Sequence, residues 1–362
     1  MSDRRKEAEK KMAKAIFISA DCWLCVFDLL PALKLGLGIA LISHRFDFYV
    51  DEHFKTRKRA LKCIRIGSNK IGKNGTKEME IANYQGQSLS SIPKIPLTGK
   101  VTGFKIILIN YIDKNAIDFL HCFRSLFASS YPINLFIYTI SDRILALIFR
   151  NIWPMIAKNI QGMFLFADVF RGLRKIAPSF LNDFSLLRIY SSYSEEFFTE
   201  FPADDNAAAS DEQAVAKWLF TAHPSKMPKL FNCSFLKDNG DWATKISAFK
   251  AEFASASSPA NFIVVIWFRL VSFADSVVPF VLTNELTREQ LSLKRTKNRN
   301  RFLLIRCPIV RDASKWAKWE KEAISCHFTD QWNQIVIPIA YECDIGDGLL
   351  DTMIGPVINK RK

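Results

Sequence analysis

The sequence predicts a mixed fold of the α+β or α/β class, in which an N-terminal helical cluster and a β-hairpin precede an array of alternating strands and helices. Three observations support this prediction. After residue 100, apolar strand candidates alternate with helical stretches, and the first four strands begin at residues 104, 133, 160 and 184. Residues 85–100 are rich in Gly, Ser and Pro, which break regular structure. The length of 362 residues is typical of two or three domains. Hydrophobic residues form 49% of the chain, which excludes a disordered protein.

The first sixty residues are expected to hold three short helices. Residues 1–14 carry nine charges and predict a frayed lead. Apolar residues then recur at helical spacing from Trp23 to Leu30, and Pro31 follows directly. Two further stretches of the same kind follow, so the helical cluster is placed at residues 15–60.

A β-hairpin and a linker are expected next. Residues 60–66 and 78–83 alternate weakly, and Asn74-Gly75 between them can adopt the positive φ values of a tight hairpin turn. The hairpin is therefore placed at residues 61–84. The Gly/Ser/Pro-rich residues 85–100 are predicted to be a linker and the main domain boundary.

Residues 101–268 are predicted to form a β-α array. The strand candidates are Phe104–Ile109, Ile133–Tyr138, Ile160–Phe166, Phe184–Tyr190, Leu230–Phe235 and Asn261–Phe268. The helical stretches include Ala116–Phe127, Arg143–Ile156 and Asp168–Phe180. The irregular spacing favours a leucine-rich-repeat-like curved array with a parallel sheet. A doubly wound α/β domain is the alternative, but it normally has a glycine-rich turn for phosphate, whereas Gly162 and Gly172 stand alone.

The remaining segments interrupt or follow the array. Residues 195–212 contain seven acidic and no basic residues and are predicted to be a solvated loop. Residues 269–350 alternate strand and helix patterns and predict a small mixed α/β cap, because the last repeat of an array otherwise exposes an apolar face. Its elements are placed at Val277–Leu282, Arg301–Cys307, Ala313–Ile324 and Gln334–Ile339, and residues 351–362 form a tail.

No enzyme motif is present in the sequence. The five histidines form neither a His-x-x-x-His pair nor a zinc-like spacing with cysteines, and the chain lacks a P-loop, a Gly-x-Ser-x-Gly elbow and the kinase motifs. We therefore predict that the protein is not an enzyme and has no metal or other cofactor. An unrecognised α/β enzyme is the alternative, but no residues can be assigned to it.

Cysteine usage and apolar runs bear on the compartment. Eight thinly spread cysteines indicate free thiols in a reducing compartment. Cys22 and Cys25 have redox spacing, but they lie in the first apolar helix, which favours core packing. The apolar run from Ala15 to Ile42 is interrupted by two aspartates, a lysine and a proline, so no membrane span is predicted. The protein is expected in the cytoplasm, the nucleus or both.

The chain is basic, with 50 Lys and Arg against 36 Asp and Glu and a formal net charge of +14. The charge gathers at residues 55–77, where nine basic residues occur without an acidic one, and at residues 288–301. Neither stretch interleaves aromatic residues in a pattern that would stack on bases. Solvated faces are therefore favoured over nucleic-acid binding.

The N-terminal residues follow a recognisable order. It consists of Ile18-Ser19, the acid Asp21, the pair Val26-Phe27, the leucines Leu30 and Leu35, and Ile42-Ser43-His44-Arg45-Phe46. This order resembles the F-box, whose pattern runs from Leu-Pro through an acid, an Ile/Val-Phe pair and two leucines to Val-Ser/Cys-x-Arg-x/Phe. The departures are Ser19 in place of proline, and Gly36 and Gly38 in the second helix. Residues 279–285 and 304–309 resemble the lineage-expanded nematode F-box proteins.

The resemblance implies a substrate receptor of a Skp-cullin-F-box type ubiquitin ligase. Its F-box, residues 15–60, would bind the Skp-type adaptor, and its β-α region would bind an unknown target protein. The residues implied in adaptor binding are Ile18, Leu24, Val26, Phe27, Leu30, Leu35, Ile42, Arg45 and Phe46. The physical expectation agrees, because three short helices cannot bury all their apolar faces and should leave an exposed patch. Two alternatives remain: these residues pack against the hairpin and the array, or the chain is a basic, nucleic-acid-binding scaffold with a degenerate F-box.

Overall fold

The fold is that of a computed structural model, which describes residues 18–30, 35, 39–56, 59–71, 77–83, 101–127, 132–139, 141–236, 241–325 and 333–351. The predicted lead, the whole predicted linker at residues 85–100 and the tail beyond Asp351 lie outside these residues. The helices are α2 Ala20–Asp28, α4 His44–Thr56, α5 Lys114–Cys122, α6 Arg124–Phe127, α7 Asp142–Asn151, α8 Trp153–Ile156, α9 Ala167–Ile176, α10 Asp211–Phe220, α11 Asp241–Ser255, α12 Val271–Ser276 and α13 Ala313–Ser325. The strands are β1 Arg59–Ile71, β2 Lys77–Asn83, β3 Val101–Ile109, β4 Ile133–Ile137, β5 Ile160–Leu165, β6 Ile189–Glu195, β7 Lys229–Phe235, β8 Phe262–Phe268, β9 Phe280–Asn284, β10 Glu289–Arg295, β11 Arg301–Pro308 and β12 Gln334–Ile337.

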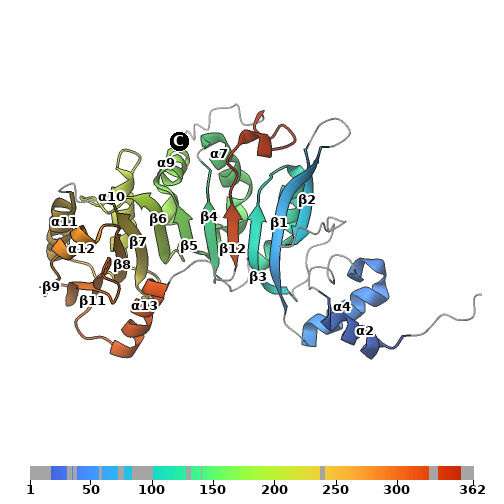
Figure 1. The fold of residues 1–362 in the computed structure, drawn as a ribbon, viewed down its shortest axis with the longest axis horizontal. Coiled ribbons are helices and arrows are strands. Elements are labelled where there is room, and N and C mark those ends of the chain that lie inside the picture. The colour runs from blue at the N-terminus through green and yellow to red at the C-terminus, as the bar shows by residue number, and fades with distance from the viewer. Residues whose placement is uncertain are drawn as a thin grey trace, which may run out of the picture.

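The strands form one twelve-stranded sheet, in the order β2-β1-β3-β12-β4-β5-β6-β7-β8-β11-β10-β9 (Figure 1). All neighbours from β1 to β8 in this order are parallel, and β2, β11, β10 and β9 are antiparallel to their neighbours. The fold is therefore a mixed α/β structure with a mostly parallel sheet. No helix among the described residues is long and apolar enough to cross a membrane.

The predicted hairpin is present, as β1 and β2 pair antiparallel from Ile64 with Asn83 to Ile71 with Lys77. Its predicted turn at Asn74-Gly75 lies outside the described residues. The hairpin is not a separate unit, however, because β1 also pairs parallel with β3. This pairing satisfies the backbone groups that an isolated hairpin would leave open along its edge.

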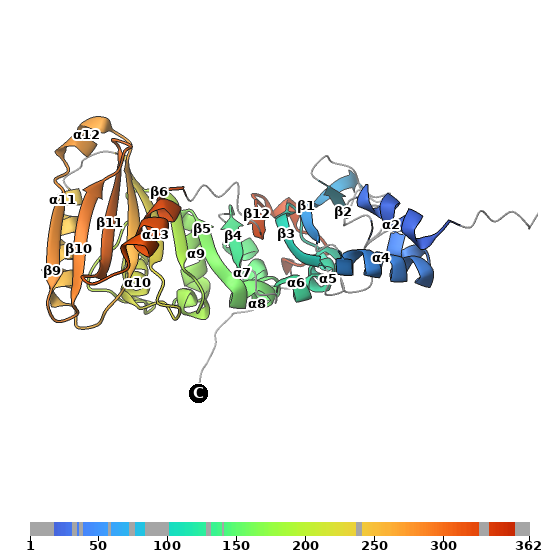
Figure 2. The ribbon, with the colours of Figure 1, turned by 90° about the horizontal axis from the view of Figure 1, so that it is seen from below.

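Consecutive strands β4 to β8 lie side by side in chain order. When every crossover is right-handed and each new strand is added on the same side of the previous strand, the connecting helices all lie on one face of the sheet. Figure 2 shows α5, α6, α7 and α8 along one side of the strands. The strand predicted at residues 184–190 is wrong: β6 begins at Ile189, and Phe184 and Leu187 are buried in the preceding loop. An apolar run does not distinguish such a loop from a strand.

The C-terminal region is not a separate cap, which corrects the prediction for residues 269–350. Strands β9 to β11 extend the sheet beyond β8, whereas β12 inserts between β3 and β4. The crossover from β3 to β4 leaves a space one strand wide, and the edges on both sides need hydrogen-bond partners. Strand β12 fills this space with Ile335 and Ile337 buried, and the Asn333 side-chain oxygen accepts a hydrogen bond from the Phe104 N–H at 3.0 Å.

The two faces of the sheet bury different residues, because successive side chains in a strand point to opposite sides. In β8, Val264 faces the core that the array helices cover, and Ile263 faces a second, smaller core. Helix α13 covers this second core with Trp316, and its Glu322 forms a bidentate ion pair with Arg188 at 2.6 and 2.8 Å.

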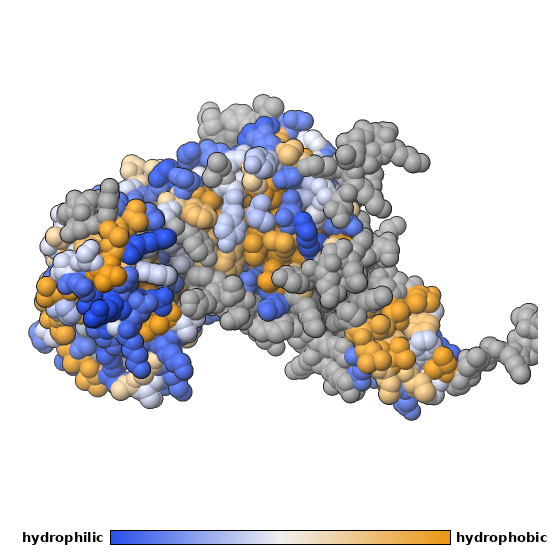
Figure 3. Space-filling view, viewed as in Figure 1, coloured by the Kyte–Doolittle hydropathy of each residue, from blue (hydrophilic) through white to orange (hydrophobic). Residues whose placement is uncertain are grey.

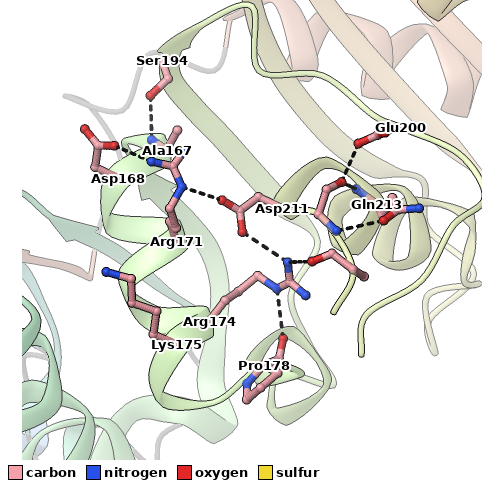
Figure 4. Close-up of polar contacts among 12 residues, drawn as sticks. Ala167, Asp168, Arg171, Arg174, Lys175, Pro178, Ser194, Glu200, Asp211 and Gln213 are labelled. Carbon is pink, nitrogen blue, oxygen red and sulfur yellow. Dashed lines mark hydrogen bonds and ion pairs between the residues drawn. The ribbon is translucent and has the colours of Figure 1, made fainter. Parts of the chain in front are cut away.

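The loop predicted at residues 195–212 is present, because residues 196–210 form no helix or strand. The loop is not solvated throughout, since its Phe197 and Phe198 are buried. Arg174 of α9 donates hydrogen bonds to the carbonyl oxygens of Asn206 and Ala209, both at 2.7 Å. Its guanidinium also pairs with Asp211 at 3.2 Å (Figure 4). One buried arginine on a neighbouring helix thus fixes a segment whose composition alone predicts solvation.

Candidate functional site

Helix α2 is the first element of the predicted adaptor-binding region. Ser19 caps its N-terminus, because the Ser19 hydroxyl accepts a hydrogen bond from the Cys22 N–H at 3.3 Å. Ser19 is the residue at which the sequence departs from the proline of the F-box pattern. It still starts a helix, by capping a free N–H.

Helix α4 begins in a similar way. The Ser43 hydroxyl accepts a hydrogen bond from the Phe46 N–H at 3.3 Å, and its carbonyl oxygen accepts one from the Asp47 N–H at 2.9 Å. A short 3₁₀ turn, Ala40–Ile42, precedes it. Most of the second predicted helix, with Gly36 and Gly38, lies outside the described residues, but Leu35 is described and is buried.

Aromatic packing holds α2 against α4. The Phe27 ring is fully buried, and its centroid lies 6.3 Å from that of Trp23, 6.5 Å from Phe46 and 5.8 Å from His53. Trp23 and Phe46 meet edge to face at 4.8 Å. Phe27 is therefore the centre of a small core that sets the relative position of the two helices.

Arg45 joins the start of α4 to the start of α2. Its Nε donates to the Tyr49 hydroxyl at 2.9 Å, and its terminal nitrogen donates to the Ile18 carbonyl at 3.5 Å. The guanidinium also lies over the Tyr49 ring, 5.3 Å from the centroid. Arg45 is exposed but engaged within the cluster, so its contacts indicate a supporting role.

The nine residues predicted to bind an adaptor separate into three groups. Ile18, Val26, Ile42 and Arg45 are exposed; Leu24, Leu30 and Phe46 are half-buried; Phe27 and Leu35 are buried. A partner can contact the first group and part of the second. Phe27 and Leu35 support the cluster from inside. A substitution of Phe27 would therefore disrupt folding, and its effect on binding would not be separable from that.

The structure adds two exposed residues that the pattern-based prediction missed. The Leu29 side chain is 84% exposed at the end of α2, and Phe48 is exposed on α4. The sequence could have indicated Leu29, because it lies three residues after Val26 and side chains at this spacing share one face of a helix. Ile18, Val26, Leu29, Ile42 and Phe48 together form what we call the N-terminal apolar patch. Figure 3 shows hydrophobic surface gathered over these helices.

Possible metal ligands and the pair Cys22 and Cys25 are the other chemical groups that the sequence singled out. No cluster of His, Cys, Asp and Glu able to hold a metal occurs among the described residues. Cys22 and Cys25 are exposed free thiols, so the prediction that they pack in the core is wrong. Phe27 is buried and Trp23, four residues earlier, is half-buried, whereas the two cysteines lie on another face of α2.

The second basic stretch, residues 288–301, is partly neutralised by nearby acids. Lys294 pairs with Glu320 at 2.6 Å, and Arg295 pairs with Asp275. The Arg301 guanidinium lies over the Trp267 ring, 5.2 Å from the centroid. These contacts reduce the positive charge that this stretch offers to a phosphate backbone.

Comparisons with protein-family models, with curated proteins and with solved structures found no match to this chain.

Proposed function

We propose that this chain is the substrate receptor of a Skp-cullin-F-box type ubiquitin ligase, acting in the cytoplasm or the nucleus. One observation carries the proposal: five large apolar side chains are exposed on or next to two short helices, α2 and α4, whose packing is set by the buried Phe27. Such a concentration of exposed apolar surface is typical of a protein-protein interface. Its position agrees with the F-box order of residues.

The proposed role is not catalytic. The N-terminal apolar patch would hold the Skp-type adaptor, and the β-α array would hold a target protein. Holding both raises the effective concentration of a target lysine near a ubiquitin-charged enzyme that other subunits supply. The long sheet supports this role as a rigid spacer, because its strands are hydrogen-bonded continuously from β2 to β9.

The test uses exposed positions only. Leu29→Asp and Ile42→Asp place a charge on side chains that are 84% and 62% exposed, so folding should be unaffected. Val310→Asp and Val278→Asp are matched controls, because these valines are at least as exposed as Ile42 and follow the far strands β11 and β8. The chain and its variants are co-expressed with a Skp-type adaptor and analysed by size exclusion.

We expect a stoichiometric complex with the unchanged chain and with both controls. The Leu29→Asp and Ile42→Asp double variant should bind at least ~10-fold more weakly, because charge at the centre of an apolar interface typically costs ~2 kcal/mol or more. Absence of a complex with the unchanged, folded chain would refute the proposal. Undiminished binding by the double variant would refute the patch as the docking surface.

A further inference from the structure

A second group of exposed apolar side chains lies where the parallel strands end. Tyr138 directly follows β4, Phe166 follows β5, and Leu236 follows β7; Leu270 and Tyr341 lie a few residues beyond β8 and β12. We call these five residues the edge row. At the opposite edge, the described residues expose Leu186, and Leu286, Ile309 and Val310 follow the antiparallel strands β9 and β11. The edge row differs from them in its aromatic pair and in the charges beside it.

The topology makes this edge continuous. Carboxyl ends of parallel strands meet at one edge of a sheet, which is where open α/β folds bind ligands. The rings of Tyr138 and Phe166 meet edge to face, with centroids 5.9 Å apart. On one side, the Ser194 hydroxyl at the end of β6 accepts a hydrogen bond from the Ala167 N–H at 2.6 Å. On the side of β12, the Ser141 hydroxyl donates a hydrogen bond to the Glu342 carboxylate at 3.3 Å. Glu342 belongs to the 3₁₀ turn Glu342–Asp344, at the top of Figure 1.

Acidic segments flank the Tyr138–Phe166 pair on both sides. Residues 195–212, which continue from β6, contain seven acidic residues, and residues 333–351, which include β12, contain four; neither segment has a basic residue. Four arginines pair with these carboxylates, namely Arg143, Arg171, Arg174 and Arg269. Lys245 also lies beside the first segment, where its Nζ donates to the Glu196 carbonyl at 3.1 Å. Eleven carboxylates against these five basic side chains leave this edge negative, although the whole chain has a formal charge of +14.

We infer that the edge row and its acidic flanks bind a basic segment of the target protein, one that presents Lys or Arg side chains beside apolar ones. Aromatic faces attract Lys and Arg cations, and the flanking carboxylates complement their charge. The positive charge elsewhere on the chain repels the same segment, which directs it to this edge. The inference deepens the proposed function, because it assigns the chemistry of the target that the receptor would hold.

The test measures peptide binding to the full-length chain by fluorescence anisotropy. The probe is a labelled 15-residue peptide that alternates Lys or Arg with Leu, and the comparison peptide has Glu at every basic position. The first variant combines Tyr341→Ser with Asp351→Lys, whose side chains are 70% and 83% exposed. The matched control combines Val281→Ser with Glu285→Lys, which makes the same kinds of change at exposed positions on and beside β9.

We expect the basic peptide to bind, the acidic peptide not to bind, and the edge variant to bind at least ~5-fold more weakly while the control stays within ~2-fold. Absence of binding by the basic peptide, or equal loss in both variants, would overturn the inference. Adaptor co-purification is measured on the same samples. If the adaptor fails to bind but the basic peptide binds at the edge, the inference stands and the ligase proposal falls.

Discussion

Arg306 and Glu289 form an ion pair in the interior of the sheet, with side chains 0% and 1% exposed. The arginine donates to one Glu289 carboxylate oxygen from Nε at 3.0 Å and from a terminal nitrogen at 2.6 Å. It also donates to the Ser258 carbonyl at 2.8 Å. The other Glu289 oxygen accepts a hydrogen bond from the Ala260 N–H at 3.0 Å. The pair thus ties β10 and β11 to the loop before β8.

We predict that Arg306→Met lowers the free energy of unfolding by ~3–5 kcal/mol. The change leaves the buried Glu289 carboxylate with the Ala260 N–H as its remaining partner among the contacts described above, and an uncompensated buried charge costs this much. It also removes the guanidinium from the Phe220 and Phe253 rings, whose centroids each lie 5.3 Å away. Replacing both partners, with Glu289→Leu and Arg306→Met together, should recover most of the loss, because no charge then remains buried.

Urea unfolding followed by circular dichroism measures the effect. Arg295→Met on the adjacent strand is the matched control, because its partner Asp275 is about half exposed. An exposed pair contributes ~0–1 kcal/mol, so this control should change stability little. A cost for Arg306→Met no larger than for Arg295→Met would refute the reasoning. A double variant as unstable as Arg306→Met would show that packing, not charge, accounts for the loss.

Two further predictions concern a buried lysine and the acidic segment. Burial lowers the pKa of Lys229 to about 7. In the unfolded chain this lysine stays protonated up to its usual pKa, so above pH 7 the unfolded state binds more protons than the folded state. The free energy of unfolding should therefore rise with pH by up to ~1.4 kcal/mol per pH unit towards pH 10. Urea unfolding at pH 7, 8 and 9 should show this rise relative to Lys229→Met, and parallel curves would contradict it. Arg174→Met removes the donors to the Asn206 and Ala209 carbonyls, so limited proteolysis should cut residues 200–210 at a lower protease concentration than in the unchanged chain. Lys175→Met, at a 60% exposed side chain that pairs with Asp142 outside this segment, is the control and should not change the cleavage pattern.

Local patterns predicted much of the fold. The hairpin followed from alternation around Asn74-Gly75, and the array helices from apolar spacing, because both signals depend on residues close in sequence. The place of β12 could not be predicted in this way, since Gln334 pairs with Ile106 and Asn134, which are distant in the chain. The order of residues 195–212 depends in the same way on Arg174, which belongs to an earlier helix.

The candidate site likewise has features that the sequence determined and features that only the tertiary structure decided. The sequence by itself determined the amphipathic helices of this region, which the structure places at Ala20–Asp28 and His44–Thr56, because periodicity and helix-starting residues are local properties. Only the tertiary structure decided that Phe27 and Leu35 are buried while Leu29 and Ile42 are exposed. It also decided that Tyr138 and Tyr341, separated by two hundred residues, share one edge of the sheet. Burial depends on which distant residues cover a side chain, and periodicity within one helix or strand does not specify those neighbours.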